Sequence, residues 1–97
     1  MKLGIVLATR VDLTAAHAIA LAARHAGHDV VVFAMDAGCA ALAAELTIAT
    51  ALLDADCDII VCSNSAVGLE LPDGIIRGSQ DDHAAVLGTS DRVIALT

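Results

Sequence analysis

Short hydrophobic runs alternate with longer alanine-rich stretches along this chain of 97 residues. Each run is dominated by Val, Ile and Leu, a pattern typical of strands that are covered on both faces of a parallel sheet. The pattern predicts five strands, at residues 2–8, 30–34, 58–62, 75–77 and 92–96.

The stretches between these strands predict helices, because alanine has the highest helix propensity. Ser79 with Asp82 three residues later approximates a capping box, which marks the start of a small helix. We expect a first helix ending at Gly27, a second and continuous helix over 37–53, a short helical turn over 67–70, and the small helix over 80–87.

The alternation of strands and helices with short links predicts an α/β fold. Such an order builds a three-layer α/β/α sandwich around an open, mostly parallel five-stranded sheet with right-handed crossovers. The chain has no linker and no internal repeat, so residues 1–97 are expected to form a single domain.

The composition is unusually apolar for so short a chain. Hydrophobic residues make up 58% of it and the mean hydropathy is +0.78. A membrane span is not expected, since the longest apolar stretch, 37–53, carries Glu45 near its middle and is rich in alanine. We therefore expect the excess apolar surface to be covered by self-association into a homo-oligomer.

Charge and cysteine content exclude several classes of function. The net charge of −7, with five Lys and Arg residues in all, argues against a nucleic-acid partner. Three cysteines without a secretion signal suit the reducing cytoplasm, and their spacing to the four histidines matches no metal site. No phosphate-binding glycine motif is present and Phe33 is the one aromatic residue, so no cofactor is expected.

The most informative residue is Cys62, which ends the third strand and precedes the polar run Ser63, Asn64 and Ser65. Ligand-binding and catalytic residues of open parallel sheets lie at the carboxyl ends of the strands, so this position predicts an accessible thiol. A short helix after it would also favour the thiolate through its dipole. The alternative is that Cys62 is a small buried hydrophobe at the end of a strand.

Other residues are expected at the same edge of the sheet. Thr9 and Arg10 follow the first strand, and Arg10 at a helix start could bind a small anion, although a solvated arginine is the simpler interpretation. Cys39 is expected near this edge as well. Cys57 begins its strand at the opposite edge and is expected to be structural, and His83 has no evident task.

In its order of elements the chain resembles the DsrE/DsrF-like family of small sulfur-relay proteins, which includes subunits of the Tus sulfur-transfer complex. The resemblance lies in residues 3–7, 26–33, 52–62 and 90–96, and most specifically in the cysteine that closes the third strand. It implies a DsrE-like subunit of a homotrimer or hexamer. It also implies that Cys62 accepts sulfur as a persulfide from a donor protein and passes it to an acceptor protein.

Two hypotheses follow from the sequence. The first is a cytoplasmic, homo-oligomeric sulfur carrier or sulfurtransferase-like protein, in which Cys62 carries the sulfur and Ser63, Asn64 and Ser65 shape its loop. The second is a non-catalytic oligomeric protein that binds a small anionic ligand or a partner protein near Thr9, Arg10 and Ser79. The sequence leaves open whether the protein is an enzyme.

Overall fold

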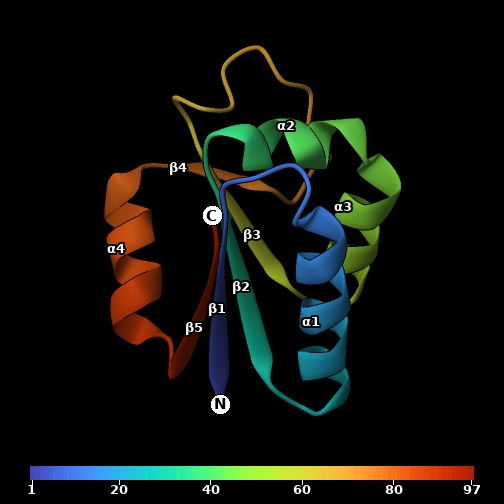
Figure 1. Cartoon of the computed structure of the whole chain (residues 1–97), viewed down its shortest axis with the longest axis vertical. Helices are drawn as coiled ribbons and strands as arrows, with labels where there is room; N and C mark the ends of the chain where they lie inside the picture. Colours follow the sequence, from blue (N-terminus) through green and yellow to red (C-terminus); the bar gives the residue numbers. More distant parts are fainter.

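A single parallel sheet organises the chain in the computed structural model, which describes residues 1–97. Its strand order is β4-β3-β2-β1-β5, and every neighbouring pair is parallel (Figure 1). The predicted α/β sandwich with an open five-stranded sheet is thus confirmed. The strands are β1 (Lys2–Leu7), β2 (Asp29–Ala34), β3 (Asp58–Cys62), β4 (Ile76–Gly78) and β5 (Arg92–Leu96).

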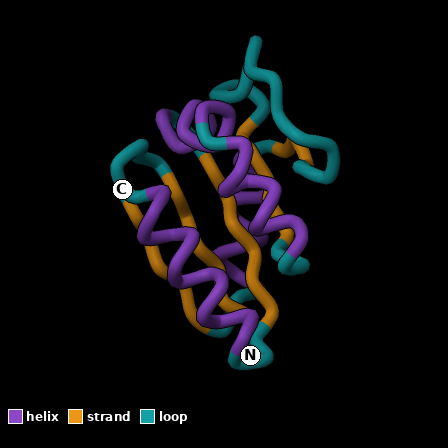
Figure 2. The backbone as a smooth tube through the Cα atoms, turned by 90° about the vertical axis from the view of Figure 1, so that its right-hand side faces the viewer, coloured by secondary structure: helices purple, strands orange, loops and turns teal.

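The helices cover the two faces of the sheet unequally. Helices α1 (Leu13–His25) and α3 (Leu46–Asp54) lie on one face, and α2 (Ala37–Ala44) crosses above the edge at which the strands end (Figures 1 and 2). The opposite face carries α4 (Gln80–Thr89) alone, which packs on β1 and β2. The two outer strands, β4 and β5, therefore have no helix over them on that face.

The core is divided in the same unequal way. Seventeen buried residues, among them Ile5, Val32 and Ile59, fill the space between the sheet and the helices α1 to α3. Under α4 the buried cluster is small and consists of Val31, Phe33, Cys62 and Val86. Fully burying one large aliphatic side chain contributes about 1.5–3 kcal/mol, so the larger cluster supplies most of the stability.

The helix expected as one element over 37–53 is broken in two. Glu45 adopts φ −120° and ψ 66°, which ends α2 and starts α3, and the two helices meet at 90°. The packing of Gly38 explains the break, because a Cβ atom there would overlap the carbonyl oxygen of Leu7. With α2 held this closely against the end of β1, the chain must turn before α3 can run down the face of the sheet.

Two smaller expectations also differ from the structure. The residues after β3 form hydrogen-bonded turns over 63–68, and no helical turn follows at 67–70. Helix α4 continues through Gly88 to Thr89, because an exposed glycine weakens a helix without ending it. No single helix has the length and apolarity to cross a membrane, and only the bent pair of α2 and α3 meets those two criteria together.

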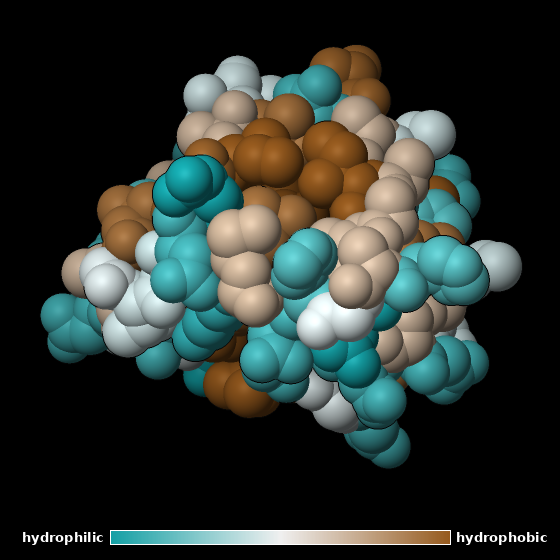
Figure 3. Space-filling model, turned by 90° about the horizontal axis from the view of Figure 1, so that it is seen from below, coloured by the Kyte–Doolittle hydropathy of each residue, from teal (hydrophilic) through white to brown (hydrophobic).

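A considerable apolar surface remains outside the core. Seen from the end at which the strands begin, hydrophobic side chains gather in one hollowed area bordered by polar residues (Figure 3). The large hydrophobic side chains that are exposed are spread over strands, helices and loops. They are Met1, Val11, Leu46, Val67, Ile76, Leu87 and Val93.

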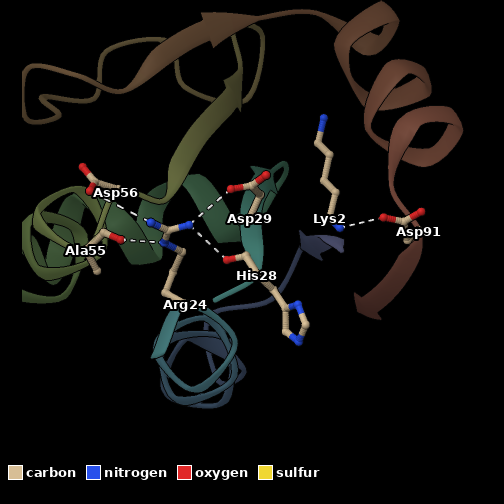
Figure 4. Close-up of polar contacts among 7 residues, drawn as sticks. All are labelled: Lys2, Arg24, His28, Asp29, Ala55, Asp56 and Asp91. Atoms are coloured by element: carbon tan, nitrogen blue, oxygen red, sulfur yellow. Dashed lines mark hydrogen bonds and ion pairs between the residues drawn. The ribbon is translucent and has the colours of Figure 1, made fainter. Parts of the chain in front are cut away.

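Arg24 joins three segments at the end of the sheet where the strands begin (Figure 4). Its guanidinium donates to the carbonyl oxygens of Ala55 and His28, both at 3.0 Å. It also lies 3.3 Å from Asp29 and 4.0 Å from Asp56. Since both carboxylates are exposed, the ion pairs contribute little, and the bonds to the carbonyls carry the structural role.

Candidate functional site

Cys62 lies on the face of the sheet that α4 covers. Its partner in the neighbouring strand is Gly78, and its side chain packs in the cluster with Phe33 and Val86. The sequence predicts an accessible thiol, but the side chain is only 5% exposed. The expectation of an open position is therefore not met. The apolar cluster lies beneath the sulfur, and polar groups lie over it.

The turn after β3 is fixed by hydrogen bonds to neighbouring strands. The backbone N–H and the hydroxyl of Ser63 both donate to the carbonyl of Gly78, at 2.9 and 2.7 Å. The hydroxyl of Ser65 accepts from the N–H of Asp36, at 2.9 Å. The turn is thus tied to β4 on one side and to the end of β2 on the other, which holds its own N–H groups in place near the thiol.

Hydrogen bonds from this turn stabilise the thiolate of Cys62. The backbone N–H of Ser65, followed by its hydroxyl, lowers the pKa of the Cys62 thiol. Burial acts in the opposite direction, and the side chain of Gln80 and the N–H of Asn64 lower the pKa further. The short helix considered from the sequence is absent, so local N–H groups take the place of a helix dipole.

The other two cysteines are held as neutral thiols. Burial is the main cause that raises the pKa of Cys39 and of Cys57. The thiol of Cys39 donates to the carbonyl of Ala34 at 3.3 Å, within the large core. A thiolate is the nucleophilic form of cysteine, so Cys62 is the thiol best suited to react.

The start of α4 lies directly over the thiol. Ser79 and Asp82 form the predicted capping box, which fixes the first turn of the helix. Gly78 allows this turn to come close, since a Cβ atom there would overlap the carboxylate of Asp82 and lie 2.8 Å from Ile60. In this position Gln80 places its side-chain Nε2 atom 3.6 Å from the sulfur of Cys62.

Thr9 and Arg10 do not share the site with Cys62. Arg10 lines a hollow with residues of α1, α2 and α3, on the opposite face of the sheet, and Glu45 lines the same hollow. The hydroxyl of Thr9 donates to Asp12 at the start of α1. Both residues follow the end of β1 as predicted, but the chain enters α1 on the face away from the thiol.

Of the predicted site residues, the structure brings Ser63, Asn64 and Ser65 around Cys62. Sequence reasoning missed Gln80 and His83, whose ring nitrogen lies 3.0 Å from the side-chain oxygen of Gln80. The sequence did contain a signal for Gln80. It is a polar residue in the first turn of α4, and α4 follows β4, which ends at the same edge of the sheet as Cys62. No group of three or more His, Cys, Asp and Glu side chains is arranged to hold a metal ion.

Comparison with known proteins gives one family and several similar folds. The family model described as the DsrE/DsrF-like family matches residues 1–96. Among solved structures, the ychN protein of E. coli is 20% identical with a TM-score of 0.76, and the alignment covers 99% of each chain.

A second solved structure is similar over nearly the same extent. It is a conserved protein of unknown function from Bacteroides thetaiotaomicron, 15% identical with a TM-score of 0.79, and the alignment covers 98% of this chain and 94% of that one. No curated protein sequence matches the chain significantly. At these identities the solved structures establish a shared fold.

Proposed function

This chain belongs to the DsrE/DsrF-like family, and from that premise we propose that it is a persulfide carrier in which Cys62 holds the sulfur. Family membership indicates sulfur relay in general terms. The observation that carries the finer proposal is the set of hydrogen bonds from Ser65, Gln80 and Asn64 that lowers the pKa of Cys62, while burial raises the pKa of the other two thiols.

The proposed reaction is a thiolate exchange at sulfur. The Cys62 thiolate attacks the outer sulfur of a donor persulfide, R–S–SH. A bond forms between the two sulfurs as the donor's S–S bond breaks, and the electron pair leaves with the donor as R–S⁻. Cys62 then carries S–SH, and the thiolate of an acceptor takes the outer sulfur by the same step, which returns Cys62 as a thiolate.

This chemistry requires one thiol and no second cysteine. Ser65, which stands three residues after Cys62, serves instead as the main hydrogen-bond donor to the sulfur. Donors that are already in place raise the fraction of Cys62 present as thiolate, and they stabilise this thiolate again when it leaves, without reorganisation during the transfer. Gln80 is exposed and its side chain contacts the sulfur, so a donor would approach Cys62 from the side of the sheet on which Gln80 lies.

We extend the proposal to the setting in which the carrier works. The exposed hydrophobic side chains support a homo-oligomer, trimeric or hexameric as the family resemblance implies. Three free thiols support the reducing cytoplasm as its compartment. Its partners would be a protein that donates sulfur and another that accepts it.

Sulfur loading tests the proposal directly. We expect native protein incubated with inorganic polysulfide to gain the mass of one sulfur atom by intact-mass spectrometry, with the added sulfur mapped to Cys62. Cys62→Ser should lose this gain. Cys39→Ala and Cys57→Ala should retain it, because burial raises the pKa of both thiols and keeps them in the unreactive neutral form. Sulfur found on Cys39 or Cys57, or on no cysteine, would contradict the proposal.

The structure favours this carrier over the anion-binding alternative. The hydroxyl of Thr9 is engaged with Asp12, and that of Ser79 accepts from the N–H of Asp81. Arg10 shares its hollow with the carboxylate-bearing Glu45, which opposes the binding of an anion. We therefore give the edge near Thr9 and Arg10 no role in the proposed function.

A further inference from the structure

Two side chains of α4 form a line of contacts that ends on the sulfur of Cys62. Gln80 Nε2 lies 3.6 Å from Cys62 Sγ, and Gln80 Oε1 lies 3.0 Å from His83 Nδ1. Residues three apart on a helix share one face, which is why both reach the same side of the thiol. The ring of His83 rests on Phe33, with centroids 5.0 Å apart and planes tilted by 37°.

The orientation of the Gln80 amide decides what it does to Cys62. Its NH2 group stabilises a thiolate, whereas its oxygen would repel one. An unrestrained amide can turn by half a rotation and present either end. A proton on Nδ1 of His83 would hold the amide oxygen by hydrogen bonding and so leave the NH2 group facing the sulfur.

We propose that Gln80 and His83 are positioning residues of the Cys62 site: His83 holds the Gln80 amide so that its NH2 group donates to the thiolate. The inference rests on the proposed function, because it assigns these residues to the same thiol. It gives His83 a role through its hydrogen bond, and it makes Phe33 the surface on which the imidazole is held.

The charged groups around the thiol leave this role to Gln80 and His83. The guanidinium of Arg77 donates hydrogen bonds to the carbonyl oxygens of Ala66 and Leu69. The carboxylate of Asp82 accepts from the N–H of Ser79 in the helix cap. Asp36 meets the site through its backbone, which donates to the hydroxyl of Ser65. None of these three side chains forms a hydrogen bond with Cys62.

The pH dependence of alkylation measures the proposed contact. The rate at which iodoacetamide modifies Cys62, followed by peptide mass spectrometry, gives a midpoint that reports thiolate formation and a plateau that reports access to the sulfur. Gln80→Ala should move the midpoint to higher pH. At pH values below the midpoint, the rate relative to the plateau should fall roughly fivefold, the ordinary effect of losing one hydrogen bond.

Two substitutions at His83 separate its hydrogen bond from its ring. His83→Phe keeps an aromatic ring on Phe33 but loses the donor, so we expect it to shift the midpoint as Gln80→Ala does. His83→Asn loses the ring but keeps an amide donor near the Nδ1 position, and should retain the native midpoint. The double variant Gln80→Ala, His83→Phe should shift the midpoint no further than Gln80→Ala alone, because both remove one interaction.

The opposite results would overturn the inference. A native midpoint in Gln80→Ala would show that the amide does not stabilise the thiolate. A shifted midpoint in His83→Asn together with a native midpoint in His83→Phe would assign the effect to the ring and the packing around it. Alkylation needs no sulfur donor, so a failure of sulfur loading would leave these midpoints intact, and an unshifted midpoint would leave loading on Cys62 intact.

Discussion

At the scale of the residue, Cys62 is activated by neutral donors. The N–H groups and hydroxyl near it come from Ser65, Asn64 and Gln80, whereas the guanidinium of Arg77 is bound to carbonyl oxygens. Salt screens interactions between charges and has little effect on short hydrogen bonds. The thiolate of Cys62 should therefore be favoured to a similar degree at low and high ionic strength.

Gly78 sets the distance between β3 and the start of α4. A methyl group at this position would overlap the carboxylate of Asp82 and press on Ile60. We expect Gly78→Ala to lower the free energy of unfolding by about 1–3 kcal/mol, the usual effect of overpacking. It should also shift the alkylation midpoint of Cys62 to higher pH, since displacing the first turn of α4 moves the Gln80 amide away from the sulfur.

Gly88→Ala is the matched control for this substitution. Gly88 lies in the same helix, and a Cβ atom there would meet nothing within 4 Å. Alanine should raise the free energy of unfolding by about 0.5–1 kcal/mol through its higher helix propensity. Urea unfolding and alkylation rates measure both variants, and equal effects at the two positions would mean that close packing at Gly78 is unimportant.

At the scale of the element, α4 depends on its capping box. The hydroxyl of Ser79 accepts from the N–H of Asp81, and the carboxylate of Asp82 accepts from the N–H of Ser79. Ser79→Ala should lower the free energy of unfolding by about 1 kcal/mol, the typical effect of losing such a cap. Because the cap also places Gln80, the same variant should shift the alkylation midpoint of Cys62 to higher pH.

Ser79→Asp keeps an acceptor at the cap and provides the comparison. Urea unfolding followed by circular dichroism should give it a stability close to that of native protein. The alkylation midpoint of Cys62 should also stay close to the native one. A loss of stability in Ser79→Asp as large as in Ser79→Ala would indicate that packing of the serine, and not its hydrogen bond, holds the helix.

The strands could be predicted from the sequence because each is a short apolar run with a clear boundary. The break at Glu45 could not, since the alanine-rich residues on both sides favour a helix and the turn comes from the packing of Gly38 on Leu7. A local pattern predicts local structure well. The bend between α2 and α3 depends on a contact between residues far apart in the chain.

The residues of the candidate site also differ in how well they could be predicted from local sequence. Ser63, Asn64 and Ser65 directly follow Cys62, so their place beside it could be predicted. Gln80 and His83 reach the thiol because β4 pairs with β3. Their place beside Cys62 could not be predicted, since the pattern of residues along the chain does not determine the order of the strands in the sheet. Thr9 and Arg10 do lie at the predicted edge of the sheet, but the chain enters α1 on the face opposite Cys62, and the pattern of residues does not show which face a helix will cover.

At the scale of the whole molecule, the face that carries α4 is only partly covered. Ile76 pairs with Ile60 in β3, and Val93 pairs with Gly4 in β1. Ile60 packs in the cluster under α4, and a Cβ atom on Gly4 would touch Val86 of α4. Paired residues of neighbouring strands point to the same face. Ile76 and Val93 therefore flank α4, with side chains 54% and 37% exposed.

The exposed side chains of Ile76 and Val93 beside α4 allow a specific test of the proposed homo-oligomer. We expect sedimentation velocity at micromolar concentration to give a mass several times that of one chain, because a second copy would cover apolar side chains that no helix of this chain reaches. Ile76→Glu and Val93→Glu should each weaken the assembly, since a buried and unpaired carboxylate is strongly unfavourable. Val11→Glu, in the loop before α1, should leave it unchanged. Native protein that sediments as a monomer would contradict self-association, and an assembly unaffected by both strand variants would place the interface on another surface.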